Sequence, residues 1–246
     1  MVIKREVLFT PADQARTLHI WLPDDYEETD ERYPVMYFFD GHNLFYDSDA
    51  TYGKSWGLKD FLERWEKKII VVGIECSHEG NNRLVEYSPY HIVNKFFGDL
   101  RGTGRETMRW MAEELKPMID REYRTYPFRE ATAIGGSSMG GLMSVYAAIA
   151  HNDVFSKAAC LSSAIGSSQK NILADFAKSP IDPDTRVYLS WGEKEGHNLR
   201  VQYRTAAEFE KRGAAVRLYE QPEGRHCEAD WEKQIGRFMD FLWLDK

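Results

Sequence analysis

Hydrophobic residues recur along the chain with two periods, one typical of strands and the other typical of helices. Leu18, Ile20 and Leu22 occupy alternate positions, which predicts a strand. The stretch 69–74 is an almost unbroken run of isoleucine and valine, typical of a strand buried on both faces. Between residues 106 and 122, apolar residues return every three or four positions and predict a helix.

The same patterns predict the elements of the remaining chain. Strands are predicted at residues 3–9, 16–22, 35–39, 69–74, 131–135, 157–161, 186–190 and 216–220. Helices are predicted at residues 106–122, 140–150, 199–212 and 231–244. The first two strands form an antiparallel pair, and strand-then-helix units follow. This order predicts an α/β fold with a mostly parallel sheet, an antiparallel N-terminal strand pair and helices on both faces.

The chain is expected to form a single domain spanning residues 1–246. A length of 246 residues suits one large α/β domain, and no repeat or Pro/Gly/Ser-rich linker divides it. The stretch 162–183 is too short to build the kind of lid that covers lipase active sites. No separate lid domain is therefore expected.

Composition and charge argue against several classes of protein. The formal net charge is −7 without a cluster of Lys and Arg, so neither nucleic acid nor a membrane is an expected partner. No apolar run approaches the roughly 20 residues that a membrane-spanning helix needs. None of the three cysteines lies at CxxC spacing, which argues against a disulfide framework and a cysteine zinc site. Since no signal peptide is recognisable at the N-terminus, a cytoplasmic location is expected.

A G-x-S-x-G pattern lies where a predicted strand passes into a predicted helix, with Ser138 at its centre. This pattern is typical of a sharp turn that exposes the serine hydroxyl, and Gly136 and Gly140 avoid clashes on either side of it. The turn also places the amide of Met139 at a helix N-terminus, where it can stabilise an oxyanion. Ser138 is therefore the candidate nucleophile.

The candidate general base is His226. A serine nucleophile needs a histidine, and sites built on this turn follow the chain order serine, acid, histidine. His226 lies in the loop after the last predicted strand, at the carboxyl edge of the sheet where ligands bind. His197 also follows a predicted strand and stays open as an alternative. His151 falls at the far end of the helix that begins beside Ser138.

The triad acid is expected in the loop after the predicted strand 186–190, which offers two glutamates. The usual reach of this loop favours Glu195, and Glu193 is the alternative. Asp182 and Asp184 precede the strand and therefore lie at the wrong end of the sheet.

The second oxyanion donor is expected just after the predicted strand 35–39. Gly41 allows the backbone to turn toward the substrate there, and the amide of His42 would point into the site. Asp47 and Asp49 lack a second cluster that would complete a metal site. No metal and no organic cofactor is therefore expected.

Three segments carry a resemblance to a known family. They are YFFDGHNLF at 37–45, RLVEYSP at 83–89 and GGSSMGG at 135–141. With them, the chain resembles the putative-esterase (esterase D / enterochelin-esterase-like) family of α/β-hydrolases, and the likeness covers nearly the whole chain. The resemblance implies the α/β-hydrolase fold.

The resemblance also implies roles for individual residues. Ser138, His226 and a loop carboxylate would form the catalytic triad, and the amides of His42 and Met139 would form the oxyanion hole. Many relatives use aspartate as the acid, whereas this chain offers Glu193 and Glu195 at that place.

The expected function is that of a serine hydrolase cleaving a carboxylic ester through an acyl-enzyme intermediate. Phe45, Trp56 and Tyr87 lie in predicted loops and are expected to line an acyl or sugar pocket. Within the resemblance, the expected substrate is a small-molecule ester, either short-chain or carbohydrate-linked (acetyl or feruloyl). An acyltransferase and a siderophore-type ester hydrolase would use the same triad and stay open, as does a homo-oligomer.

Overall fold

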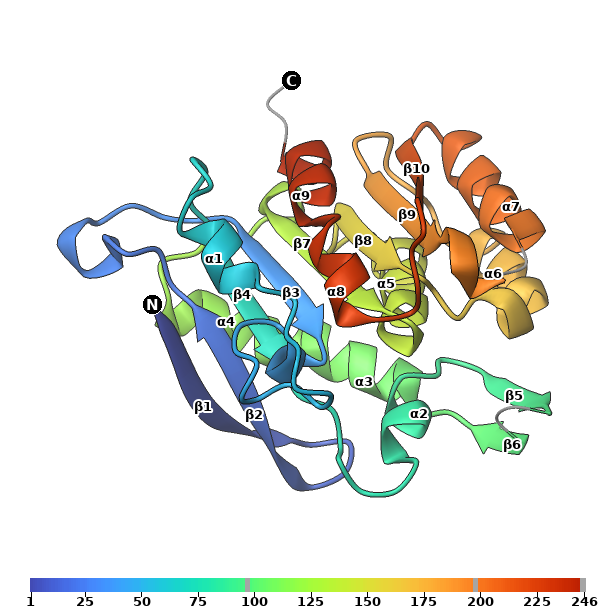
Figure 1. Cartoon of the computed structure of the whole chain (residues 1–246), viewed down its shortest axis with the longest axis horizontal. Helices are drawn as coiled ribbons and strands as arrows, with labels where there is room; N and C mark the ends of the chain where they lie inside the picture. Colours follow the sequence, from blue (N-terminus) through green and yellow to red (C-terminus); the bar gives the residue numbers. More distant parts are fainter. Residues whose placement is uncertain (96–97, 197–198, 244–246) are drawn as a thin grey trace.

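A mixed sheet forms the centre of the protein. The computed structural model describes residues 1–95, 98–196 and 199–243. Within them, eight strands form one sheet in the order β1-β2-β4-β3-β7-β8-β9-β10 (Figure 1). These are β1 (Val2–Phe9), β2 (Gln14–Trp21), β3 (Val35–Phe39), β4 (Ile70–Ile74), β7 (Thr132–Ser137), β8 (Lys157–Leu161), β9 (Arg186–Gly192) and β10 (Ala215–Gln221). β2 runs antiparallel to β1 and β4, and the other pairs are parallel, which confirms the predicted sheet.

Helices cover both faces of the sheet (Figure 1). They are α1 (Leu58–Leu62), α2 (Asn82–Glu86), α3 (Gly104–Trp110), α4 (Lys116–Glu122), α5 (Met139–Ala150), α6 (Gln169–Phe176), α7 (Leu199–Glu210), α8 (Glu228–Glu232) and α9 (Ile235–Trp243). α1, α8 and α9 pack on one face, and α3 to α7 pack on the other. Among the described helices, none has both the length and the apolar character required to cross a bilayer.

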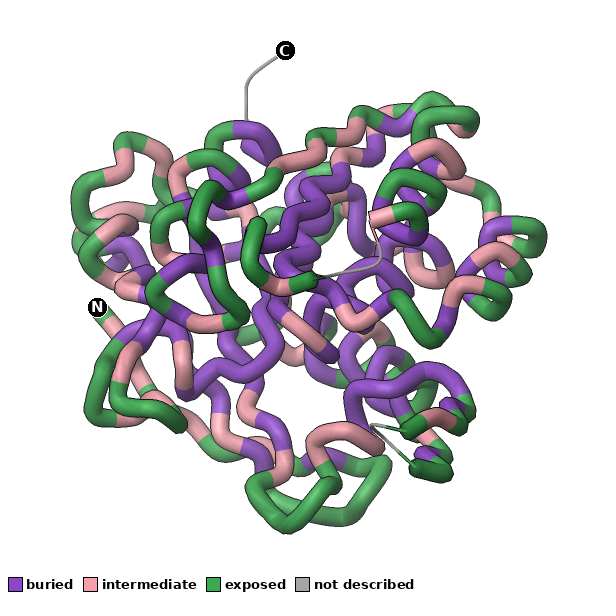
Figure 2. The backbone as a smooth tube through the Cα atoms, turned by 45° about the vertical axis from the view of Figure 1, so that its right-hand side comes forward, coloured by how far each residue is buried: buried purple, intermediate pink, exposed green. Residues whose placement is uncertain are grey.

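The two faces of the sheet bury alternate residues of the same strands. Val35 and Tyr37 of β3 belong to the core under α5, whereas Met36 and Phe38 belong to the core under α9. All five residues of this strand are buried. Burial on both faces explains why the central strands read as continuous apolar runs. Figure 2 shows buried backbone through the centre of the molecule and exposed segments in the outer loops.

Two predicted helices differ from the prediction. The predicted helix 106–122 contains a π-helical stretch, Met111–Leu115, between α3 and α4. Pro117 follows this stretch and lacks the N–H that a continuous α-helix would use there. The predicted helix 231–244 is split into α8 and α9, and residue 244 lies outside the described residues.

Five of the named elements were not predicted from the hydrophobic pattern. Three of them are the helices α1, α2 and α6. The other two are β5 (His91–Asn94) and β6 (Gly98–Arg101), which form a small antiparallel hairpin apart from the main sheet. Each strand of the hairpin buries a single side chain, Ile92 or Leu100, which is too few to produce an alternating pattern.

Candidate active site

Ser138 occupies a strained turn between β7 and α5. Its φ is 59° and its ψ is −119°, a conformation that L-residues rarely adopt. A Cβ on Gly136 would lie 2.8 Å from the carbonyl carbon of Gly140, and a Cβ on Gly140 would lie 2.9 Å from Cβ of Phe39. Both contacts are too close, so this turn requires glycine at both positions. The predicted sharp turn is therefore present, and it presents Ser138 at the start of α5.

His226 and Glu195 meet at the carboxyl edge of the sheet. His226 Nδ1 lies 2.8 Å from Glu195 Oε2, and the histidine side chain is 43% exposed whereas the glutamate side chain is 2% exposed. Because a carboxylate only accepts hydrogen bonds, Nδ1–H is the donor. This tautomer leaves Nε2 of His226 without a proton, as a general base requires.

The buried carboxylate of Glu195 is held by two further donors. Its Oε1 accepts a hydrogen bond of 2.7 Å from the Gly192 amide and one of 2.6 Å from the Ser162 hydroxyl. Trp231 Nε1 in turn donates to Ser162 Oγ over 2.8 Å. Sequence reasoning missed Ser162 and Trp231. Ser162 directly follows β8, so its position at the carboxyl edge was the available signal.

The alternative acid and the other histidines lie elsewhere. Glu193 is exposed, and its Oε2 accepts a hydrogen bond from the Glu223 amide over 2.8 Å. His151 caps the C-terminus of α5, the opposite end from Ser138. His197, the alternative base, lies outside the described residues.

The segment after β3 is fixed in place by close backbone packing. A Cβ on Gly41 would lie 2.3 Å from the carbonyl carbon of Gly73 in β4, so only glycine fits. Gly41 begins a short 3₁₀ turn, Gly41–Asn43, and Met139 begins α5. The first N–H groups of a helical segment have no partner within it. The amides of His42 and Met139 therefore lie at the N-terminal ends of helical segments, at the carboxyl edge of the sheet.

Asp40 anchors the same segment from the other side. Its backbone is left-handed, with a φ of 57°, and its buried carboxylate accepts hydrogen bonds of 2.7 and 2.6 Å from Arg83. The Asp40 amide also donates to the Tyr87 hydroxyl over 3.2 Å. These contacts hold the backbone that leads to His42, and they give Tyr87 a structural role.

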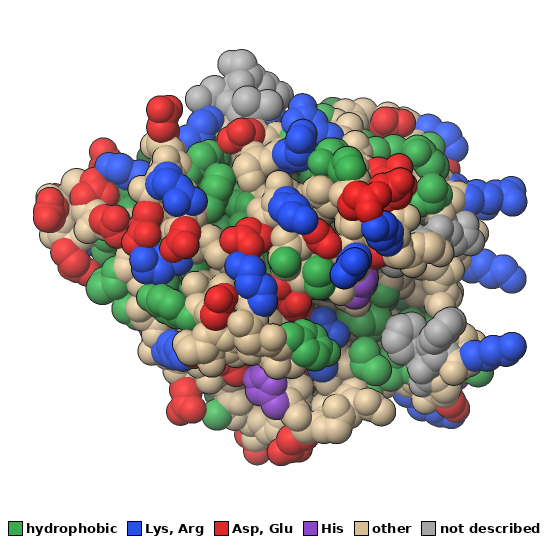
Figure 3. Space-filling view, in the orientation of Figure 1, with side chains coloured by type: hydrophobic (Ala, Val, Ile, Leu, Met, Phe, Trp, Pro, Cys, Tyr) green, Lys and Arg blue, Asp and Glu red, His purple; other side chains and the backbone are tan. Residues whose placement is uncertain are grey.

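A pocket of about 290 Å³ contains both Ser138 and His226. Most of its other lining residues have polar side chains, among them Asn43, Thr51, Ser77, His78, Arg83 and Glu228. Burial raises the pKa of the Glu228 carboxyl above its ordinary value, and the charge of nearby Asp40 adds to this. Burial also lowers the pKa of the His42 imidazole, which favours its neutral form. Figure 3 shows acidic and basic side chains interspersed over one face of the molecule, with histidines reaching its surface.

The three aromatic residues expected to contact substrate lie in the core instead. Phe45, Trp56 and Tyr87 are only 5%, 3% and 2% exposed, and none lines the pocket. Trp56 packs against Phe38 and Trp231, and Tyr87 against Phe39. The sequence placed them correctly in loops, but the loops fold their aromatic rings inward because this buries large apolar surfaces.

Comparisons with known proteins agree with this architecture. A family described as "Putative esterase" matches residues 11–239. The uncharacterised protein YbbA of Bacillus subtilis is 25% identical over 184 residues, which cover 74% of this chain and 69% of YbbA. An IroE-like serine hydrolase from Shewanella oneidensis superposes with a TM-score of 0.76 at 20% identity, covering 98% of this chain and 79% of that one. A ferulic acid esterase superposes with a TM-score of 0.70 at 17% identity, and the match covers 98% of this chain and 97% of that one. At these identities the two structures show the fold, which is of the α/β-hydrolase type.

Proposed function

The chain belongs to the putative-esterase family and is a carboxylic ester hydrolase, and on this basis we propose that Ser138, His226 and Glu195 form its catalytic triad. The hydrogen bond between His226 Nδ1 and Glu195 Oε2 supports this assignment most directly. Ser138 lines the same pocket as His226 and lies on a turn that exposes its hydroxyl.

In the proposed reaction, His226 Nε2 takes the proton of Ser138 while Oγ attacks the ester carbonyl. The carbonyl becomes a tetrahedral oxyanion, which the amides of His42 and Met139 stabilise. His226 then gives its proton to the departing alcohol, and an acyl-enzyme remains. Water, deprotonated by His226, attacks this acyl group and releases the acid and free Ser138. Glu195 keeps the imidazole in the required tautomer throughout.

The proposed substrate is a small polar ester, short-chain or carbohydrate-linked. The pocket is small, and its polar side chains Asn43, Thr51 and Ser77 suit the hydroxyl groups of a sugar better than a long alkyl chain. An acetyl or feruloyl group on a sugar hydroxyl fits this chemistry, and one protein of the same fold is a ferulic acid esterase.

A series of p-nitrophenyl esters from acetate to octanoate tests this proposal. The kcat/KM is expected to fall by at least about tenfold along the series, because the polar pocket gives long chains no apolar surface to contact. Acetylated and feruloylated sugars are then compared with p-nitrophenyl acetate, and products are analysed with and without an added acceptor alcohol. A preference for octanoate would contradict the proposed substrate class, and acyl transfer to the alcohol exceeding hydrolysis would make the protein an acyltransferase.

Ser162 is expected to position the triad acid. Ser162→Ala removes a hydrogen bond to the Glu195 carboxylate, which is worth about 1.5–3 kcal/mol, and kcat is expected to fall by about tenfold or more with little change in KM. The same change leaves the Trp231 N–H without its partner, so the free energy of unfolding should fall by about 1–3 kcal/mol.

Ser163→Ala is the matched control for this prediction. Ser163 is equally buried and adjacent, but its Oγ has no hydrogen-bond partner among the described residues. Its removal should leave kcat unchanged. Equal kcat values for Ser162→Ala and the wild type, measured on folded protein, would show that Ser162 does not position Glu195.

A further inference from the structure

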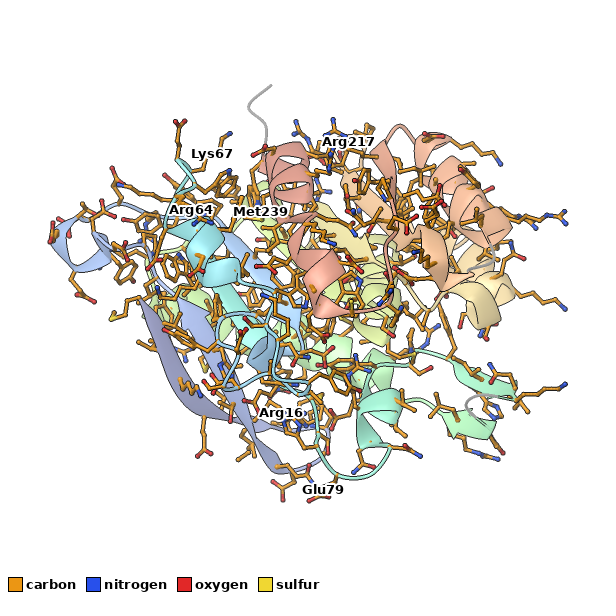
Figure 4. All side chains as sticks on the ribbon, viewed as in Figure 1. Arg16, Arg64, Lys67, Glu79, Arg217 and Met239 are labelled. Atoms are coloured by element: carbon orange, nitrogen blue, oxygen red, sulfur yellow. The ribbon has the colours of Figure 1, made fainter. Side chains whose placement is uncertain are left out.

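Two loops at the carboxyl edge bring three metal-ligating side chains together. His42 comes from the turn after β3, and Cys76 and His78 come from the loop after β4. One ligand atom from each of the three lies within 4.8 Å of the others. The two imidazole rings have centroids 4.7 Å apart and an interplanar angle of 73°. Figure 4 labels Glu79 at the outer end of the loop after β4.

The His42 side chain carries an unused nitrogen in a buried position. The residue is only 6% exposed, and its Nδ1 is buried without a hydrogen-bond partner in the described part of the chain. Its Nε2 lies 2.9 Å from Thr51 Oγ1. In the tautomer whose Nε2–H donates to Thr51, Nδ1 has a free lone pair. A histidine oriented by a hydrogen bond at one nitrogen, with the other nitrogen free, is the usual arrangement of a metal ligand.

His78 shows the same arrangement. Its Nε2–H donates to Glu75 Oε2 over 3.0 Å, and the carboxylate can only accept. His19 fixes the other oxygen of Glu75, because its Nε2 lies 2.6 Å from Oε1. A carboxylate that orients a histidine through one nitrogen leaves the second nitrogen to bind a metal.

We propose that Nδ1 of His42, Sγ of Cys76 and Nδ1 of His78 form a binding site for Zn²⁺ in the wall of the ester pocket. One thiolate and two imidazoles are ligands that Zn²⁺ prefers, and three protein ligands leave a fourth position open to water. The thiol loses its proton to solvent when the Zn–S bond forms. Zinc bond lengths imply ligand atoms roughly 3.3–3.8 Å apart. The ligand atoms of the three side chains lie within 4.8 Å of one another, and the exposed His78 side chain can rotate to bring them closer.

Bound zinc would inhibit the ester hydrolysis proposed above, and this part of the inference rests on that function. His42, Cys76 and His78 line the same pocket as Ser138 and His226. A zinc ion with its water would occupy part of this small pocket. Substrate and Zn²⁺ should therefore exclude each other, and removal of the metal should restore activity.

Metal binding is tested on the full chain without any ester. CoCl₂ is expected to bind 1:1 and give a thiolate-to-cobalt charge-transfer band, and calorimetry should show 1:1 binding of ZnCl₂. Cys76→Ser should abolish the band, and His78→Gln should weaken zinc binding at least about tenfold. Cys227→Ser is the matched control and should keep the band, because Cys227 is a half-buried thiol outside the cluster.

Lack of saturable binding by folded wild type, or a band that survives in Cys76→Ser, would overturn the site. If Cys76→Ser does not fold, zinc affinity of His78→Gln equal to that of the wild type would overturn it.

Inhibition is measured separately on p-nitrophenyl acetate. Zn²⁺ should raise the apparent KM of the wild type, EDTA should reverse this, and His78→Gln should need at least about tenfold more zinc for the same effect. Zinc that binds without changing hydrolysis would overturn the inhibitory role. A protein that hydrolyses no ester but still gives the cobalt band would refute the proposed function while supporting the metal site.

Discussion

Ser138→Ala is expected to lower kcat/KM for p-nitrophenyl acetate by at least about 10⁴-fold, because it removes the atom that forms the acyl-enzyme. Alanine has the same backbone restrictions as serine at the φ of 59°, so the strained turn should form in the variant as well. The measurement is the initial rate of hydrolysis by wild type and variant, with circular dichroism to show that both are folded.

Ser137→Ala is the control that separates the two adjacent serines. Ser137 is the last residue of β7 and is 6% exposed, whereas Ser138 lies on the turn itself. The kcat/KM of Ser137→Ala should be several orders of magnitude higher than that of Ser138→Ala. Substantial turnover by folded Ser138→Ala would show that another group is the nucleophile.

Glu195→Gln is expected to lower kcat by roughly 10³–10⁴-fold. A glutamine amide can donate a hydrogen bond to His226 Nδ1, which favours the tautomer with the proton on Nε2 and leaves no base for Ser138. Because the Glu195 side chain is only 2% exposed, the glutamine that replaces it cannot turn toward solvent. The kcat at saturating ester is the quantity to compare.

Glu193→Gln is the matched control, because both glutamates lie in the 3₁₀ turn Glu193–Glu195. Glu193 is exposed and its carboxylate accepts a hydrogen bond from the Glu223 amide, so kcat should change less than about threefold. Similar losses in the two variants would contradict the assignment of Glu195 as the triad acid.

The environment of Glu195 links this side chain to two strands and one helix. Gly192 ends β9, Ser162 follows β8, and Trp231 lies in α8. Together they place the carboxylate through hydrogen bonds of 2.6 to 2.8 Å. The left-handed backbone of Ser162, with a φ of 46°, directs its hydroxyl into this network. The position of the proposed triad acid therefore depends on contacts between segments that are neighbours in space.

Local sequence patterns determined the framework of this protein. The turn at Ser138 is recognisable from five residues of sequence, although Gly136 is required by the nearby backbone of Gly140 and Gly140 is required by its contact with Phe39 of β3. The central strands of the sheet are continuous apolar runs because both faces are buried. Chain order and the carboxyl edge then led to His226 as the proposed base. These features are local or follow from the topology of parallel sheets, so the sequence alone predicts them.

The tertiary structure decided the contacts between distant segments. The contact of His226 with Glu195 rather than Glu193 depends on the direction of one short turn. Phe45, Trp56 and Tyr87 face inward rather than toward a ligand. His42 meets Cys76 and His78 because Gly41 packs on Gly73 and joins the two loops. No periodic pattern records such contacts, since hydrophobic periodicity reports which face of an element is buried and not which residue lies opposite.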